Sequence, residues 1–394
     1  MTVEPTGTEE RTGKKRGEET RRRGPATGDD RDPVLELDGV TKSFGPETAI
    51  EYLSLSVREG ELLTLLGPSG CGKTTTLRLL AGLDRPDAGR IRVAGETVAG
   101  ESRFVPPEDR DIGLVFQEFA LFPHLTVAEN VAFGIDDWSG DEREARVAEL
   151  LDLVSLSGYG DHDPDDLSGG QRQRVALARS LAPEPDVLLL DEPFSNLDVA
   201  LRKEMREEVR AIIKETGVTA VSVTHDQEEA LSISDRVAVV HDGRVEQIGR
   251  PEAVFEHPES RFVADFLGQA GFLSGELKEG LIETGVETLH AGMLEGLSRE
   301  YDGAAVDVLV RPDDLAATPI GERSDGSRSE GDDPPGEGRI VTREYTGPAF
   351  VYGVELDSGE LVHCQHNHAA DLGVGQRVGV ELTADHTLAW FPAE

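Results

Sequence analysis

The sequence predicts an α/β domain built on a parallel sheet, followed by a small all-β domain. Short apolar runs alternate with helical periodicity between residues 62 and 240, which is typical of strands and helices that form a parallel sheet. A glycine-rich turn lies between one of these strands and the next helix. After about residue 267, short strands are separated by Gly, Asp and Ser, a pattern typical of a small β barrel.

Composition narrows the classes of protein that this chain can represent. Its 394 residues suffice for two domains, and a formal net charge of −38 disfavours nucleic acid or anionic lipid as the main partner. So many carboxylates predict adaptation to high salt, where charges are screened within roughly 3 Å. Cys71 and Cys364 are too few for a disulfide framework, which indicates a reducing compartment. No apolar run reaches the length of a membrane span.

The chain begins with a segment that has little to bury. Residues 1–32 hold eight acidic and eight basic residues, so we expect a disordered tail. From Val34 onward, alternating apolar residues predict antiparallel strands over 35–40, 53–57 and 90–98, with a turn at 42–45.

Residues 62–83, LLTLLGPSGCGKTTTLRLLAGL, have the three parts of a phosphate-binding loop: an apolar strand, a glycine-rich turn and a helix. The glycines allow backbone N–H groups to converge on phosphate oxygens, and the start of the helix adds positive potential. We expect Lys73 to reach the outer phosphates and Thr74 to place its hydroxyl on Mg²⁺. A chance match to the motif would not bring a strand and a helix on its two sides.

The later elements are predicted from periodicity. Apolar runs at 112–116, 187–190, 218–223 and 237–240 predict buried strands, the last of which would end the core. Helical spacing predicts helices over 141–156, 173–182 and 202–214. In the all-β part, strands are predicted at 306–310, 339–343, 350–356, 360–363 and 377–382, with a hairpin turn at 357–359. Residues 319–338 are predicted to be a flexible surface insertion.

Three ionisable residues stand at the ends of apolar strands. Asp191 would lie beside the phosphate-binding loop and hold Mg²⁺. Glu192 would point elsewhere, which suits a base that orients the attacking water. His225 ends another strand and would contact the terminal phosphate. A structural acidic pair is the alternative for Asp191 and Glu192. A lone histidine at a strand end more often has a structural role, and only the whole set of residues favours a catalytic role for His225.

Residues 167–171, LSGGQ, form a second candidate anion site, because a serine and two glycines stand where a helix begins. Two such sites in one domain make sense if the second completes the nucleotide pocket of another molecule. With VLLLDEP at 187–193, SNLD at 195–198, and Gln117 and His225 in the same order, the chain resembles the ATPase subunit of an ABC transporter over residues 34–250.

This resemblance implies a role for each matched residue. Phe44 would stack on adenine, Glu192 would be the catalytic base, and His225 would be the switch histidine. Gln117 would sense Mg²⁺ and the attacking water, and the Mg²⁺ would be held by Thr74, Gln117 and Asp191. The phosphates of ATP would be bound by Gly67, Pro68, Ser69, Gly70, Cys71, Gly72, Lys73, Thr74 and Thr75. In a homodimer, the partner's ATP would be contacted by Ser168, Gly169, Gly170, Gln171 and Asp198.

The resemblance also implies a domain organisation and partners. A nucleotide-binding domain would cover 33–267, with a RecA-like core, an antiparallel β subdomain and a helical subdomain at about 118–182. A TOBE-type, OB-like regulatory domain would cover 268–394. Residues 118–134 resemble the surface that receives permease subunits; ordinary helical core is the alternative. The dimer would work at the cytoplasmic face of the membrane, with an extracytoplasmic solute-binding protein as an indirect partner.

One nucleotide-binding domain with a C-terminal β domain resembles importers of sugars, polyamines, ferric iron and oxyanions such as sulfate, molybdate and tungstate. EPFSNLD at 192–198 and FVADFLGQAGFLSG at 262–275 are most similar to the ferric-iron branch, so ferric iron is the predicted solute. A soluble ABC ATPase without a transport role is the alternative from another class. It would need a second nucleotide-binding domain or a long coiled coil, and neither is in the sequence.

One motif lies outside the family pattern. On an extended chain, Cys364, His366 and His368 would share one face, and their ligand types suit a soft or borderline metal ion. The alternative is a polar, exposed strand end.

Overall fold

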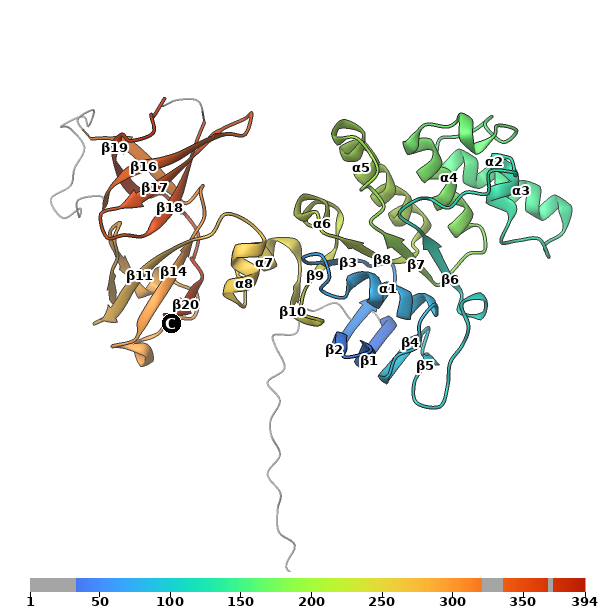
Figure 1. Cartoon of the computed structure of the whole chain (residues 1–394), viewed down its shortest axis with the longest axis horizontal. Coiled ribbons are helices and arrows are strands. Elements are labelled where there is room, and N and C mark those ends of the chain that lie inside the picture. The colour runs from blue at the N-terminus through green and yellow to red at the C-terminus, as the bar shows by residue number, and fades with distance from the viewer. Residues whose placement is uncertain (1–32, 321–335, 368–370, 394) are drawn as a thin grey trace, which may run out of the picture. The chain divides into compact units, whose positions relative to one another are not determined.

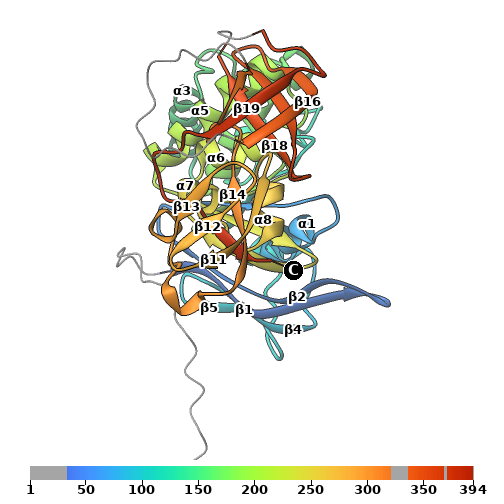
Figure 2. The same cartoon turned by 90° about the vertical axis from the view of Figure 1, so that its left-hand side faces the viewer.

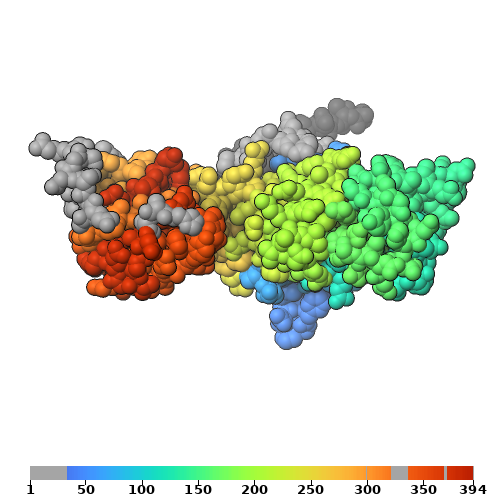
Figure 3. Space-filling view, turned by 90° about the horizontal axis from the view of Figure 1, so that it is seen from above, coloured from blue at the N-terminus to red at the C-terminus, as the bar shows by residue number. Residues whose placement is uncertain are grey.

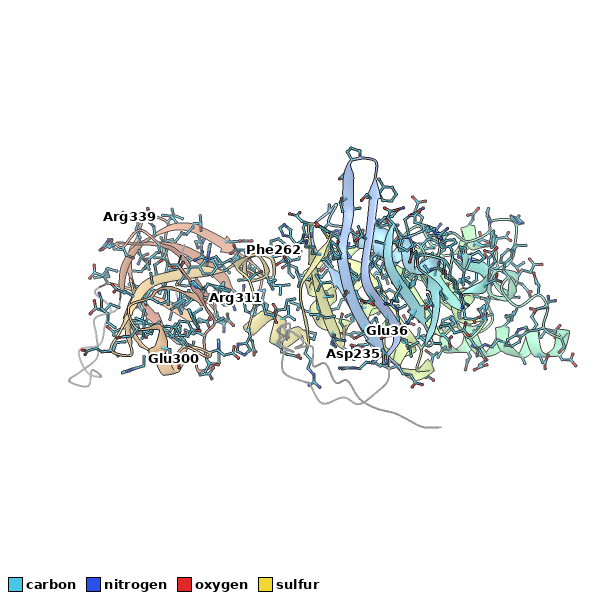
Figure 4. The ribbon with its side chains drawn as sticks, turned by 90° about the horizontal axis from the view of Figure 1, so that it is seen from below. Glu36, Asp235, Phe262, Glu300, Arg311 and Arg339 are labelled. Atoms are coloured by element: carbon cyan, nitrogen blue, oxygen red, sulfur yellow. The ribbon has the colours of Figure 1, made fainter. Side chains whose placement is uncertain are left out.

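The computed structural model describes residues 33–320, 336–367 and 371–393; the predicted tail and most of the predicted insertion lie outside these ranges. The first part of the described chain contains two sheets (Figure 1). One is antiparallel with the order β2-β1-β4-β5, formed by β1 (Pro33–Phe44), β2 (Glu47–Arg58), β4 (Ala88–Val93) and β5 (Glu96–Ala99). In Figure 4, β1 and β2 form a long blue hairpin that extends beyond its neighbours. The predicted turn at 42–45 was placed too early, because Ser43 still pairs with Thr48 across this hairpin.

The second sheet has the order β10-β9-β3-β8-β7-β6 and is parallel except for β10. Its strands are β3 (Leu62–Leu66), β6 (Ile112–Val115), β7 (Val187–Asp191), β8 (Thr219–Thr224), β9 (Arg236–His241) and β10 (Arg244–Gly249). All five residues of β3 are buried, as expected for a central strand covered on both faces. The prediction that β9 ends the core was wrong, since the partly polar β10 extends the sheet. In the edge strand β6 only Val115 is buried and the other three residues are half-buried, so the prediction of a buried strand there is confirmed only in part.

Helices surround this sheet, and α2, α3 and α4 gather beside β6 (Figure 1). The bounds are α1 (Lys73–Ala81), α2 (Val127–Ala132), α3 (Gly140–Leu153), α4 (Gly169–Leu181), α5 (Val199–Thr216), α6 (Gln227–Ile233), α7 (Pro251–Glu256) and α8 (Arg261–Phe266). Thr126 and Ser139 begin α2 and α3 with capping boxes, in which side chain and backbone exchange hydrogen bonds with a glutamate three residues later. None of the described helices has the length and apolar character needed to cross a bilayer.

The C-terminal part is all β, as predicted, and consists of two five-stranded antiparallel sheets (Figure 2). The first, β13-β12-β11-β14-β20, contains β11 (Gly271–Lys278), β12 (Leu281–Glu283), β13 (Thr288–His290), β14 (Ala305–Val310) and β20 (Trp390–Pro392). The second, β15-β19-β16-β17-β18, contains β15 (Leu315–Pro319), β16 (Gly336–Tyr345), β17 (Phe350–Leu356), β18 (Leu361–His366) and β19 (Arg377–Leu382). Both sheets contribute to one apolar core.

The predicted details of this part are partly confirmed. The turn at 357–359 joins β17 to β18, which pair as a hairpin. The predicted insertion at 319–338 was too long at both ends, because Pro319 belongs to β15 and 336–338 belong to β16. Short 3₁₀ turns occupy Pro107–Asp109, Pro164–Asp166, Ala291–Met293 and Arg299–Tyr301.

Candidate functional site

The phosphate-binding loop connects β3 to α1 in a tight curve. A Cβ on Gly67 would lie 2.2 Å from the carbonyl oxygen of Val240, and a Cβ on Gly72 would lie 2.4 Å from that of Ala49, so neither position has room for a side chain. Gly72, the residue before the helix, also has φ of 102°, a conformation that glycine adopts readily. The sequence therefore needs glycine here for backbone packing as well as for phosphate access.

Lys73 turns into this loop. The residue is 6% exposed, and its Nζ donates hydrogen bonds of 2.8 Å to the carbonyl oxygens of Gly67 and Pro68. The ammonium group is thus held at the centre of the curve, where it can exchange carbonyl partners for phosphate oxygens. Ser69 and Gly70 at the crest of the loop and Thr74 at the start of α1 are exposed, Thr75 is half-buried, and Cys71 is buried.

The aromatic residue predicted to stack on adenine is accessible. Phe44 ends β1 and is 51% exposed, which is unusual for a phenylalanine. Lys42 Nζ lies 5.3 Å from the centre of its ring, so one charged group lies close to this aromatic surface. The position is consistent with a role in stacking on a flat ligand.

Asp191 and Glu192 stand at the carboxyl end of β7. Burial raises the pKa of Asp191, the adjacent negative charge of Glu192 raises it further, and Arg78 acts in the opposite direction. Glu192 has φ of 44°, an uncommon conformation for a residue with a side chain, and its N–H donates to the carbonyl oxygen of Val223. Such conformations cluster at functional sites, where the surrounding structure holds them.

The three residues predicted to be catalytic meet at the Glu192 carboxylate. Gln117, just after β6, donates from Nε2 to Glu192 Oε2 at 3.4 Å. Nδ1 of His225, just after β8, lies 3.1 Å from Glu192 Oε1. Residues separated by more than 100 positions are therefore brought together by three neighbouring strands of one sheet. This convergence follows from parallel strands, whose carboxyl ends share one edge.

The LSGGQ segment lies at the start of α4, where Ser168 and Gln171 form a capping box. The Ser168 hydroxyl accepts a hydrogen bond from the N–H of Gln171 at 3.3 Å, and the Gln171 side chain accepts from the Ser168 N–H at 2.9 Å. Asp198 begins α5 in a similar way, accepting from the N–H of Leu201. Across the described residues, no hydrogen bond or ion pair joins 168–171 or Asp198 to the phosphate-binding loop.

Known proteins resemble this chain over both of its parts. A family model described as "ABC transporter" matches residues 50–195, and one described as "TOBE domain" matches residues 308–390. The spermidine/putrescine import ATP-binding protein PotA of Rubrobacter xylanophilus is 44% identical over 377 residues, which cover 93% of this chain and 96% of the relative. The chain belongs to the ATPase subunits of ABC importers.

Other relatives of this importer ATPase are named for different solutes. The sulfate/thiosulfate import protein CysA 2 of Chromobacterium violaceum is 48% identical, covering 72% of this chain and 76% of its own. The Fe(3+) ions import protein FbpC of Rhizobium etli is 45% identical, with coverage of 84% and 90%. The solved structure of cbiO1 from Clostridium perfringens, part of the complex cbiONQ, is 30% identical with a TM-score of 0.53, covering 57% of this chain and 90% of that one.

Ser195 and Asn196 also belong to the ATPase site, although the sequence motifs assign them no role. Ser195 Oγ accepts a hydrogen bond from Gln117 Nε2 at 3.2 Å and donates to the Glu192 carbonyl oxygen at 2.9 Å. Asn196 Nδ2 donates to the Gln117 carbonyl oxygen at 2.8 Å. Their position directly after the acidic pair was visible in the sequence, but nothing there showed that they would tie Gln117 to Glu192.

Glu229 on α6 is another residue to which the sequence assigns no role. It is 2% exposed, it accepts a hydrogen bond from Thr224 Oγ1 at 2.9 Å, and burial raises its pKa to about 8. A buried glutamate five residues after a strand end gives no signal in the sequence, because its burial depends on how α6 packs.

We predict that Glu229 makes the stability of the ATPase depend on pH. The folded state keeps a proton that the unfolded chain loses near pH 4.5, so the Glu229 contribution to the free energy of unfolding falls as the pH rises from about 4.5 to about 8. Glu229→Gln should remove this fall and stabilise the protein at pH 8 by up to about 5 kcal/mol. Urea unfolding at pH 5 and pH 8, with the exposed Glu207→Gln as control, measures the difference; an equal effect at both pH values would contradict the prediction.

The surface predicted to receive permease subunits borders a groove between α2 and α3. The groove has a volume of about 680 Å³ and an apolar floor that includes Leu125, Phe133 and Val147, and it is also lined by the charged residues Glu129, Asp136, Arg143 and Glu144. Phe133 is 50% exposed, whereas Phe119 is buried in the core, so only part of the predicted patch lies at the surface. Figure 3 shows the surface of this helical region in green.

The motif at 364–368 does not offer the metal ligands that the sequence suggested. Cys364 lies in the apolar core, where burial raises the pKa of its thiol to about 12 and disfavours the thiolate that binds metals. His366 Nε2 accepts a hydrogen bond from the N–H of Ala317 at 2.9 Å. His368 lies outside the described residues, within which no metal-binding cluster of three such residues is found. The alternative of a polar, exposed strand end is confirmed only in part, since Gln365 and Asn367 are exposed but Cys364 is fully buried.

Proposed function

We propose that this chain hydrolyses ATP as a homodimer and so drives solute import through permease subunits at the cytoplasmic face of a membrane. The observation that carries the proposal is the position of the Glu192 carboxylate between Gln117 and His225. These residues follow the carboxyl ends of parallel strands, and the loop that leads to Lys73 follows the carboxyl end of β3 in the same sheet. Glu192 is suited to accept a proton from a water molecule that attacks the terminal phosphate, and its two side-chain partners fix its orientation.

Lys73 and the loop around it supply the electrostatic part of the reaction. The ammonium group would leave the carbonyl oxygens of Gly67 and Pro68 for the phosphate oxygens, while the N–H groups at the start of α1 point toward the same charge. Phe44 would hold the adenine, because its exposed ring provides a flat apolar surface.

The residues at the site fit a hard divalent cation. Burial and the adjacent Glu192 raise the pKa of Asp191, and a cation would relieve the unfavourable concentration of negative charge. Thr74, Gln117 and Asp191 would hold Mg²⁺ through oxygen atoms, and no hydrogen bond among the described residues uses Gln117 Oε1. When bound, Mg²⁺ would neutralise charge on the phosphate oxygens.

A second copy of the chain would complete each site. Ser168 caps α4 with its oxygen as acceptor, which leaves the hydroxyl hydrogen to donate to the partner's ATP. The residues 168–171 and Asp198 have no bond to the loop of their own chain in the described structure, so contact across a head-to-tail dimer accounts for their position. The permease would dock in the groove between α2 and α3, where Phe133 offers an apolar anchor. A solute-binding protein would take part outside the membrane.

For the solute we propose ferric iron, supported by the similarity of 192–198 and 262–275 to that branch and by the FbpC relative. Phe194 in the first segment is fully buried, so it acts as a marker of the branch and has no contact with solute. Polyamine and sulfate are the competing solutes, because relatives with these names are 44% and 48% identical to this chain.

Uptake measurements test the import role and the solute together. Cells that lack this chain should lose uptake of radioactive ferric iron and keep uptake of spermidine and sulfate. The parental gene should restore the loss, and a gene carrying Glu192→Gln should not. Loss of spermidine or sulfate uptake would overturn the solute and leave the import role; unchanged uptake of all solutes that this group imports would contradict both.

A further inference from the structure

We propose that Arg206 is a positioning residue for ATP hydrolysis: through Asp226 it holds the loop that carries His225 against Glu192. The inference rests on the role of His225 proposed above. It concerns a contact between α5 and the residue directly after His225, far from the phosphate-binding loop in sequence.

His225 has little to hold it in place by itself. Its side chain is 57% exposed, and its ring contacts Glu192 through Nδ1 at 3.1 Å. An exposed imidazole that must meet one carboxylate depends on its backbone for its position.

Asp226 anchors this backbone. Its N–H donates to Thr224 Oγ1 at 3.1 Å, and its Oδ1 accepts from the N–H of Glu229 at 3.0 Å, which caps α6. Its other oxygen, Oδ2, accepts from Arg206 Nη2 at 2.7 Å. Asp226 is thus fixed to the strand before His225, to the helix after it, and to α5.

Arg206, the partner of Asp226 on α5, is buried. It is 5% exposed on a helix whose other face is charged, and Glu228 is its second acidic partner at 3.4 Å. Arg202, one turn earlier, lies 3.7 Å from the same Asp226 oxygen and donates to the carbonyl oxygen of Leu197, the residue before Asp198. Helix α5 therefore connects the segment that would meet the partner's ATP with the loop that carries His225.

The charges that surround Asp226 come from helices α5 and α6. Arg202 and Arg206 attract the Asp226 carboxylate, whereas Glu228 and Glu229 repel it when they are ionised.

The test compares two arginines of the same helix. Arg206→Met should lower kcat about tenfold to a hundredfold, because a small misplacement of a reacting group has this effect, while KM for ATP stays within about twofold. Arg210→Met is the matched control: Arg210 pairs with Asp235, labelled in Figure 4, at 3.4 Å and has no contact with Asp226 among the described interactions. The control should leave kcat unchanged.

A double variant separates positioning from general damage. If Arg206 acts through His225, adding Arg206→Met to His225→Ala should cause no further loss of kcat. If kcat of the double variant is lower than that of His225→Ala by the factor that Arg206→Met causes alone, the inference is overturned. A parental kcat in Arg206→Met also overturns it. If Arg206→Met does not fold, Asp226→Asn keeps the cap of α6, weakens the ion pair and carries the same expectations. A parental kcat in His225→Ala would instead contradict the proposed function.

Discussion

Glu192→Gln is expected to bind ATP normally and to hydrolyse it about a hundredfold to ten-thousandfold more slowly, the range that a general base contributes. The amide has the shape of the carboxylate and can still bond to Gln117 and His225, but it cannot accept a proton at neutral pH. Because hydrolysis would be needed to separate two chains joined through ATP, the variant should also accumulate as a dimer when ATP is present.

Three measurements check this expectation. Phosphate release gives the rate, equilibrium binding gives the ATP affinity, and sedimentation with and without ATP gives the dimer. Glu207→Gln, an exposed change on α5, serves as control and should behave as the parental chain. Hydrolysis by Glu192→Gln at the parental rate would show that Glu192 is not the base.

Lys73→Ala is expected to lose nucleotide affinity by about tenfold to a hundredfold and to lose turnover with it. Charge-assisted hydrogen bonds contribute about 1.5–3 kcal/mol, and each 1.4 kcal/mol corresponds to a factor of about ten. The change also leaves the carbonyl oxygens of Gly67 and Pro68 without their present donor, so the thermal midpoint should be measured alongside binding. Lys214→Ala is the control, since Lys214 also donates to a backbone carbonyl, that of Gly60, but lies outside the site. Parental ATP affinity in Lys73→Ala would contradict the assignment.

Mixing Lys73→Ala with Ser168→Asp tests whether two chains together form each ATP site. Aspartate still caps α4 but repels phosphate, so each variant alone should be inactive. In a mixed dimer, the intact loop of one chain meets the intact LSGGQ of the other. Random exchange should therefore restore about a quarter of the parental rate, because about half the dimers are mixed and each has one working site. No recovery on mixing would contradict sharing between chains.

The agreement between sequence and structure is closest where a local pattern has a direct physical cause. The spacing of Val147, Leu150 and Leu151 predicts a helix over 141–156; the structure has α3 over 140–153, with these three residues buried. The strand at 62–66 and the turn after it followed from apolar and glycine residues whose roles do not depend on distant parts of the chain. The strands at 350–356 and 377–382 have the predicted bounds.

The predictions failed where a distant part of the chain decides the outcome. The strand β10 was missed because an edge strand buries few residues, and only its pairing with β9 makes it a strand. Cys364 alternates with polar residues as a surface ligand would, yet packing of the two β sheets places it in the core. Alternation gives two faces of a strand but does not say which face is buried.

The sequence by itself determined the chemistry of this protein: the phosphate-binding loop, the acidic pair, the histidine and the LSGGQ segment are local motifs whose residue types and order are typical of the ATPase subunit of an ABC transporter. Only the tertiary structure decided how these residues are held. The hydrogen bonds from Gln117 and His225 to Glu192, and from Arg206 to Asp226, join positions that are far apart in the chain. Such contacts depend on which strands become neighbours and on how α5 and α6 pack, and no local pattern of residues contains that information.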